Sequence, residues 1–160
     1  MMSENIPTPY VYDAVVKDDW LDENGHMNVA YYMSAFDDGG EVFFADPGIG
    51  WEYTRQKVGT VFIVSSKVDY FSELMAGQKF RVTSRLLEFN KKMLNVYYEI
   101  LDAEERLCAR AEILYIHILF ATRKSAPMPP KVLARLDKIF GAHQREPLPE
   151  NLGAGVGIRK

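Results

Sequence analysis

The spacing of hydrophobic residues predicts one long helix in the first third of the chain. Between residues 29 and 44, apolar or small residues recur every three or four positions, which is typical of a helix with one buried face; they are Val29, Tyr32, Met33, Phe36, Gly40 and Phe43. Asn28 precedes this run and suits a helix N-cap, because its side-chain oxygen can accept from a free backbone N–H. Asp46, Pro47 and Gly48 predict the end of the helix.

Two consecutive glycines, Gly39 and Gly40, interrupt the helical pattern. Each costs about 1 kcal/mol relative to alanine in a helix interior. The sequence therefore predicts either close packing of the helix backbone at this point or an early break.

A change from helical spacing to alternation marks the second half of the chain. Alternating polar and apolar residues predict strands with one buried face, and they occur after an irregular segment, 49–59, in the runs 61–71, 78–89, 93–101 and 106–122. An earlier β-branched and aromatic run, 10–17, predicts a first strand.

The connections between the later strands are short. Those at 75–77, 90–92 and 102–105 are short enough for hairpins, which predicts a four-stranded antiparallel meander. A short amphipathic helix follows, outlined by Val132, Leu133, Leu136, Ile139 and Phe140. One sheet packed on one long helix makes the fold class α+β.

Composition and charge narrow the class of protein. The 160 residues, 48% hydrophobic and 26% charged, predict one globular domain over 9–145 with flexible termini at 1–8 and 146–160. The net charge of −3 argues against nucleic acid as the main partner. No apolar run approaches the ~20 residues that a membrane-spanning helix needs. With a single cysteine, Cys108, and no signal-peptide pattern, the sequence predicts a cytoplasmic protein.

Several kinds of site find no support in the sequence. The three histidines, His26, His117 and His143, have no ligand spacing, so no metal site is predicted. Cys108 lies within an alternating run, where a buried inert cysteine is expected more often than a nucleophile. The glycine-rich nucleotide-binding motifs and the Gly-x-Ser-x-Gly elbow are absent from the sequence, which argues against most nucleotide-binding and serine-hydrolase functions.

Asp22 is the best candidate for chemistry. It lies one tight turn before the predicted helix, beside Gly25, which adopts backbone angles denied to other residues. A carboxylate there can attack an acyl group or activate water, while N–H groups at the helix start stabilise negative charge on a carbonyl oxygen. The alternative is that Asp22 and Asn28 only shape a turn and cap a helix. His26 can likewise contact substrate, although a lone histidine beside a turn is more often structural.

The run Asp22-Glu23-Asn24-Gly25-His26-Met27-Asn28, followed by aromatic residues, resembles the Asp-x-x-Gly-His-hydrophobic-Asn motif of hotdog-fold acyl-CoA thioesterases of the 4-hydroxybenzoyl-CoA thioesterase type. The resemblance extends to the order of elements over residues 9–123. It implies a hotdog fold, in which an antiparallel sheet wraps around one long central helix. It also implies hydrolysis of an acyl-CoA thioester to a carboxylic acid and coenzyme A.

The resemblance implies a role for each matching residue. Asp22 would be the nucleophile or general base, with His26 and Asn28 beside it in the catalytic site. The groups expected to position and polarise the thioester carbonyl at the helix N-terminus are those of Gly25, Met27 and Val29. The acyl pocket is expected at Tyr31, Tyr32 and Phe36, and the coenzyme A phosphates at Lys91 and Lys92 of the hairpin after residue 89.

The family also implies partners. Its members form dimers with sites at the subunit interface, and these dimers often pair into tetramers, so a homodimer or homotetramer is expected. An acyl-CoA is the expected substrate, with no cofactor, no metal, no nucleic acid and no membrane partner.

Aromatic residues leave the acyl group open. Rings in and after the predicted helix are suited to line a pocket for an aryl acyl group or to cage a quaternary ammonium by cation–π attraction; they are Tyr31, Tyr32, Phe36, Phe43, Phe44, Trp51 and Tyr53. The second possibility follows from a fainter similarity of the run Asn24 to Tyr32 to thioesterases of carnitine and betaine metabolism. A hotdog hydratase or dehydratase and a non-catalytic acyl-CoA binding module are the alternative functions.

Overall fold

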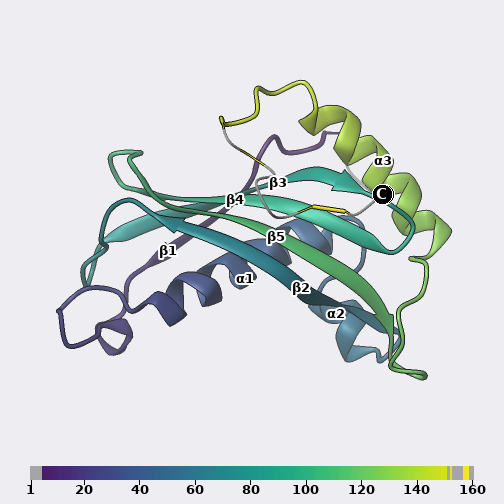
Figure 1. Ribbon diagram of the computed structural model, residues 1–160, viewed down its shortest axis with the longest axis horizontal. Coiled ribbons are helices and arrows are strands. Elements are labelled where there is room, and N and C mark those ends of the chain that lie inside the picture. The colour runs from purple at the N-terminus through teal and green to yellow at the C-terminus, as the bar shows by residue number, and fades with distance from the viewer. Residues whose placement is uncertain (1–4, 151, 153–156, 159–160) are drawn as a thin grey trace.

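Five strands of the computed structural model form one antiparallel sheet in the order β1-β3-β4-β5-β2 (Figure 1). The structure describes residues 5–150, 152 and 157–158. Its strands are β1 (Tyr10–Val15), β2 (Gly59–Tyr70), β3 (Lys79–Phe89), β4 (Met93–Asp102) and β5 (Leu107–Leu119). Its helices are the short 3-10 helix η1 (Asp18–Trp20), α1 (Val29–Ala45), α2 (Trp51–Arg55) and α3 (Pro130–His143). The long central helix, the five strands and the last helix confirm the predicted α+β class.

The predicted meander is correct for three of its four strands. Hairpins join β3 to β4 and β4 to β5, as expected. The prediction was wrong for β2, which pairs with β5 and forms the edge opposite β1. After Tyr70 the chain instead crosses to the other side of the sheet, with Leu74 O accepting from Met27 N–H at 2.7 Å on the way. Alternation identifies the buried face of a strand but carries no information about its neighbour.

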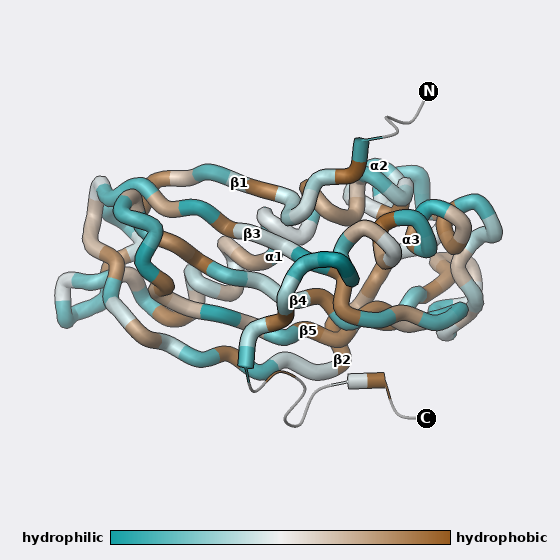
Figure 2. The backbone as a smooth tube through the Cα atoms, turned by 90° about the horizontal axis from the view of Figure 1, so that it is seen from above, coloured by the Kyte–Doolittle hydropathy of each residue, from teal (hydrophilic) through white to brown (hydrophobic). Residues whose placement is uncertain are grey.

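The sheet curves around α1, and the buried face of this helix meets the inner face of the sheet (Figure 1). The buried residues of α1 are Tyr32, Ala35, Phe36, Gly39, Gly40, Phe43 and Phe44. Val29 was predicted on this face but is 58% exposed, because it lies in the terminal turn, at the edge of the core. Along β3 the predicted alternation is confirmed, with Phe80 and Val82 buried and Arg81 exposed. Figure 2 shows hydrophobic and hydrophilic stretches following one another along the strands.

The two glycines of α1 mark close packing and not a break. A methyl group added at Gly39 would lie 2.5 Å from Val82 Cγ1, and one at Gly40 would lie 2.7 Å from the Tyr98 hydroxyl oxygen. The helix continues unbroken through both positions. Glycine is therefore required here by the distance between helix and sheet.

The end of α1 is tied to α3 and β1. Asp46, the C-cap of α1, accepts hydrogen bonds from Arg135 Nε at 2.5 Å and from the Tyr10 hydroxyl at 2.5 Å. Burial alone would raise the pKa of Asp46, but the hydrogen bonds from Arg135 and Tyr10 outweigh it and lower this pKa. The cluster fixes the helix end against two elements that are distant in sequence.

Two further segments differ from expectation or extend it. Residues 49–59 were predicted as irregular but contain α2, whose first N–H, that of Trp51, donates to Glu41 Oε2 at 2.8 Å. A distant carboxylate thus caps a helix too short to show periodicity. The termini that were predicted to be flexible fall partly outside the described residues. In the described part of the C-terminal one, Pro147 O accepts from Arg85 Nη1 at 2.7 Å.

Candidate active site

The predicted motif forms a tight hairpin just before α1. Leu21 and Met27 form an isolated antiparallel bridge. Between them, Asp22 N–H donates to His26 O at 3.0 Å, and Gly25 N–H donates to Asp22 O at 3.0 Å. Gly25 has a φ of 79°, in the left-handed region that glycine adopts without strain. The glycine of the motif therefore closes the turn that presents Asp22.

The carboxylate of Asp22 is held but still accessible. Its Oδ1 accepts from Asn24 N–H at 2.8 Å. Its Oδ2 lies 3.8 Å from His26 Nδ1, and the side chains of Asp22 and His26 are 21% and 32% exposed. One carboxylate oxygen is thus fixed by the turn, while the other faces a histidine and is left available for chemistry.

The hairpin is anchored on both sides. Met27 is fully buried, and the N–H of Asn28 donates to Trp20 O at 2.9 Å. Trp20 stacks on Tyr31, with ring centroids 5.3 Å apart and planes 13° from parallel. These contacts fix the position of Asp22 relative to the first turn of α1.

Asn28 caps α1 as predicted, because its Oδ1 accepts from Ala30 N–H at 2.9 Å. The N–H groups of Gly25 and Met27 already donate to Asp22 O and Leu74 O. Among the described residues, no acceptor is found for the N–H groups of His26 and Val29. Val29 N–H at the helix start is therefore the predicted polarising group that remains free to bind a substrate oxygen.

The aromatic residues predicted for the acyl pocket are buried or stacked on other rings within the chain. Tyr32 is 4% exposed and contacts Tyr70, and Phe36 is fully buried against Tyr98. Tyr31 is occupied by its stacking on Trp20. These positions argue against a pocket lined by Tyr32 and Phe36 within one chain, because both rings contribute to the core between helix and sheet.

Lys91 and Lys92 lie at the opposite end of the molecule from Asp22. They line a cavity of about 380 Å³ with Asn90, Met93 and Ile116. The start of β3 is near the motif, since Phe80 contacts Trp20, whereas the lysines follow its last residue. At roughly 3.3 Å per residue, the length of β3 separates the two regions by about 33 Å. One chain therefore does not bring Asp22 and these lysines together.

A cavity that sequence reasoning missed lies between α1, α2 and the start of β2. Its volume is about 490 Å³, and its lining includes Asp37, Glu41, Phe44, Trp51 and Tyr115. The five residues come from α1, α2 and β5, and others in the lining come from β2, so no local motif marks them. The only signal in the sequence was the unusual number of aromatic residues in and after the long helix.

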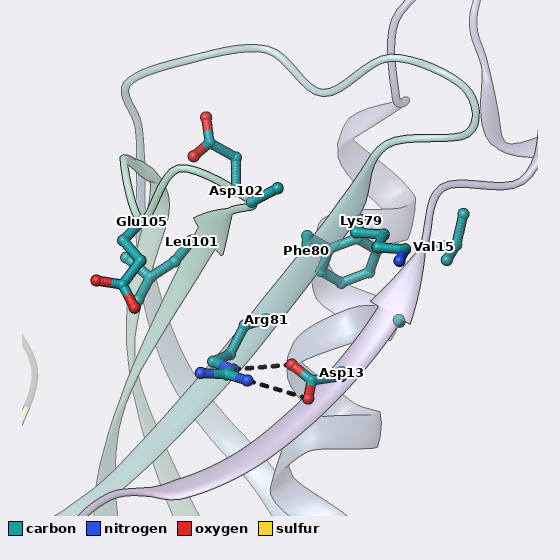
Figure 3. Close-up of a pocket in the computed structure, with 10 residues that line it drawn as sticks. Asp13, Val15, Lys79, Phe80, Arg81, Leu101, Asp102 and Glu105 are labelled. Carbon is teal, nitrogen blue, oxygen red and sulfur yellow. Dashed lines mark hydrogen bonds and ion pairs between the residues drawn. The ribbon is translucent and has the colours of Figure 1, made fainter.

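A larger cavity, of about 620 Å³, lies at the β1 end of the sheet and contains no residue of the motif (Figure 3). Arg81 and Asp13 cross it as a two-point ion pair, with Nε to Oδ1 at 2.8 Å and Nη2 to Oδ2 at 3.2 Å. Arg81 and Asp13 are thus paired with each other, and Asp102, which also lines the cavity, is paired with Arg106.

Other kinds of chemistry find no site in the part of the chain that the structure describes. No group of three or more histidine, cysteine, aspartate or glutamate side chains there is arranged to hold a metal ion. Cys108 is buried, and burial raises the pKa of its thiol, which disfavours the reactive thiolate. None of the helices in this part is long and apolar enough to cross a membrane.

Comparison with known proteins agrees with this geometry. The model of the thioesterase-like superfamily matches residues 16–136. A betainyl-CoA thioesterase of Pseudomonas aeruginosa is 26% identical over 148 residues, which are 92% of this chain and 93% of that protein. An L-carnitine dehydrogenase/betainyl-CoA thioesterase of Agrobacterium fabrum is 27% identical over 91% of this chain, which spans only 30% of that longer protein.

Among solved structures, a hypothetical protein of Staphylococcus aureus in complex with CoA superposes with a TM-score of 0.85. It is 23% identical, and the match covers 97% of this chain and 98% of that one. The hotdog fold implied by the motif is confirmed. With a family match over most of its length and a motif hairpin at the start of the central helix, this chain belongs to the thioesterase-like superfamily, as the Asp-x-x-Gly-His-hydrophobic-Asn motif indicated.

Proposed function

We propose that the protein hydrolyses an acyl-CoA thioester, with Asp22 as nucleophile or general base. The observation that carries this proposal is the Asp22 carboxylate, which is fixed through one oxygen and lies at the start of α1. Water supplies the oxygen of the new C–O bond, the C–S bond breaks, and coenzyme A leaves as a thiol. The names of the relatives, betainyl-CoA thioesterases among them, support the same reaction class.

The start of α1 supplies the second half of the chemistry. The free backbone N–H of Val29 and the side-chain NH2 group of Asn28 are suited to hold the thioester oxygen as negative charge develops on it. His26, 3.8 Å from Asp22, orients the carboxylate or contacts the substrate. Gly25 and Met27 act through the hairpin, since their N–H groups are used within the fold.

The active assembly contains two copies of the chain, paired through β2. In the described chain β2 is hydrogen-bonded on one side only, to β5. Its exposed apolar side chains Phe62, Ile63 and Val64 are 41%, 43% and 49% exposed. A long edge strand with exposed apolar residues is suited to pair with another strand. A two-fold axis would then make the two β2 strands antiparallel.

This pairing would bring the two ends of the molecule together. The end of β2 lies near the motif, since Tyr70 contacts Tyr32 in the first turns of α1. The start of β2 lies near the lysine hairpin, because Lys92 O accepts from His117 N–H and His117 pairs with Val61. Lys91 and Lys92 of one copy would therefore lie on the same side as Asp22 of the other, where they are suited to bind coenzyme A phosphates.

The test is Asp22→Asn, assayed by thiol release from a panel of acyl-CoAs. Asparagine retains an oxygen for the Asn24 N–H, so the hairpin is expected to remain intact. Turnover on the best substrate should fall by about 10²–10⁴-fold. Glu23→Gln, at the exposed neighbouring position, is the matched control and should keep native turnover.

Two results would count against the proposal. Full turnover by Asp22→Asn would remove the assigned role of this carboxylate. Release of no thiol from any acyl-CoA by the native protein would favour an acyl-CoA binding module, or a hydratase if a double bond is hydrated instead.

A further inference from the structure

The cavity between α1, α2 and the start of β2 is unlike an ordinary apolar pocket. Its polar side is formed by two carboxylates of α1, Asp37 and Glu41. They are four residues apart and therefore lie on the same side of the helix. None of the described residues that line the cavity is a lysine, arginine or histidine. The cavity wall consequently carries an excess of negative charge.

Both carboxylates are held at the cavity by the structure. Glu41 Oε2 accepts from the N–H of Trp51, and a methyl group at Gly50 would lie 2.7 Å from Glu41 Oε1. Glu41 thus lies directly over the start of α2. Asp37 has no hydrogen-bond or ion-pair partner among the described residues. Loss of hydration raises the pKa of each carboxyl group. At Asp37 the neighbouring charge of Asp38 adds to this effect, whereas at Glu41 the Trp51 N–H and the nearby charge of Arg55 oppose it.

Aromatic rings form much of the remaining wall. Phe44 and Tyr115 meet edge to face, with centroids 4.8 Å apart. The Tyr115 hydroxyl is occupied by a 2.8 Å hydrogen bond with the Tyr98 hydroxyl. Trp51 is 46% exposed and contributes a ring at the surface. Aromatic faces attract methylated ammonium groups by cation–π interaction, as carboxylates attract them by charge.

We infer that this cavity binds the positively charged end of the acyl group, a quaternary ammonium, and that Asp37 and Glu41 select for its charge. The inference rests on the proposed thioester hydrolysis. It chooses between the two acyl classes that the aromatic residues had left open. An aryl group would gain from the rings but nothing from the two carboxylates, and an acyl group with a second carboxylate would be repelled by them.

The cavity would serve Asp22 of the second copy. Residues 28 and 37 of α1 are about 14 Å apart at 1.5 Å per residue. A short cationic acyl group cannot span this distance within one chain. Antiparallel pairing of β2 with a second copy places that copy's motif beside the start of this β2, where Thr60 contacts α2 through Thr54. The cavity of one copy would then bind the charged end of the acyl group, and Asp22 of the other copy would act on its carbonyl.

The test compares two substrates of nearly identical shape. Betainyl-CoA carries a trimethylammonium group, and 3,3-dimethylbutyryl-CoA carries a neutral tert-butyl group in its place. With the full-length native protein, kcat/KM measured by thiol release should be at least tenfold higher for betainyl-CoA. Asp37→Asn and Glu41→Gln should each lower this ratio by about tenfold, the equivalent of one ordinary charge contact.

The variants are chosen to keep the fold. Asp37 makes no contact that asparagine would lose, and glutamine at position 41 can still accept from the Trp51 N–H. Asp137→Asn, at an exposed position of α3 that does not line the cavity, removes one carboxylate elsewhere and is the matched control, which should leave the ratio unchanged. A native ratio near one, or a ratio that survives both cavity substitutions, would overturn the inference while turnover of the neutral substrate still supported the proposed hydrolysis. Failure to release thiol from both of these substrates would also overturn the inference, whereas only failure on the whole acyl-CoA panel would reject the proposed hydrolysis.

Discussion

At the scale of single residues, His143 is held in one protonation state by its two hydrogen bonds. Its Nδ1 accepts from the backbone N–H of Leu86 at 2.9 Å, so the proton lies on Nε2, which donates to Pro7 O at 2.8 Å. Burial, and then the nearby charge of Arg85, lowers the pKa of His143 below its ordinary value of 6.5. A second proton would place two donors, Nδ1–H and Leu86 N–H, against each other.

The stability of the protein should therefore depend on His143 in acid. Because the folded pKa is lowered, its contribution is full above pH 6.5 and is lost as the pH falls below this value, where the unfolded chain takes up the proton first. Urea unfolding over roughly pH 5 to 8 should show a decline that is smaller in His143→Gln. An equal decline in both proteins would show that His143 does not carry the effect.

Local chemistry decides which of these residue roles a sequence can reveal. The capping role of Asn28 follows from its residue type and its place before a periodic run. The role of His143 does not, because its partners Pro7 and Leu86 are distant in sequence. The sequence does not reveal the cavity either, because its carboxylates look like ordinary polar residues of a helix and the rest of its wall is distant in sequence.

At the scale of elements, the ion pair of Asp46 and Arg135 joins the end of α1 to α3. The side chains are 16% and 7% exposed, and Arg135 contacts both carboxylate oxygens. Removing one partner leaves the other charge buried without compensation. Asp46→Asn should therefore lower the free energy of unfolding by about 3 kcal/mol.

The matched control for Asp46→Asn is Asp13→Asn. It breaks a pair of the same geometry with Arg81, but these side chains are 64% and 47% exposed. Solvent screens such a pair, so its loss should change stability far less. Urea unfolding measures both, and equal losses would contradict the assigned role of burial. The double substitution Asp46→Asn with Arg135→Met should recover part of the lost stability.

Element boundaries were largely predictable, while element partners were not. Periodicity identified α1, α3 and four of the five strands, because burial on one face imposes it, and residue composition identified β1. It did not identify the partner of β2, since β5 and β3 present equally suitable edges to an alternating strand. It also missed α2, which has only five residues and whose first N–H is capped by Glu41 of another helix.

At the scale of the whole molecule, the free edge of β2 is the surface proposed to join two copies. Val64→Lys places a charge on this edge at a residue that does not line the cavity. Charged edge positions oppose strand pairing. Sedimentation should show a dimer for the native protein and a monomer for the variant, and thiol release by the variant should fall in parallel.

Val11→Lys provides the control for this substitution. Val11 is 42% exposed on β1, the opposite edge of the sheet, so the same charge there should leave the dimer and its turnover intact. A native protein that is monomeric and active at micromolar concentration would rule out the two-copy site.

The glycine pair of α1 has a consequence for regions that it does not touch. Gly39 and Gly40 set the depth at which the helix lies against Val82 and Tyr98. A single added methyl group would push the middle of the helix outward and tilt both of its ends, one beside the motif hairpin and the other beside the carboxylate-lined cavity. Displacements of about 1 Å at reacting groups are enough to cost large factors in rate. The positions of the motif hairpin and of the carboxylate-lined cavity therefore depend on the lack of side chains at Gly39 and Gly40.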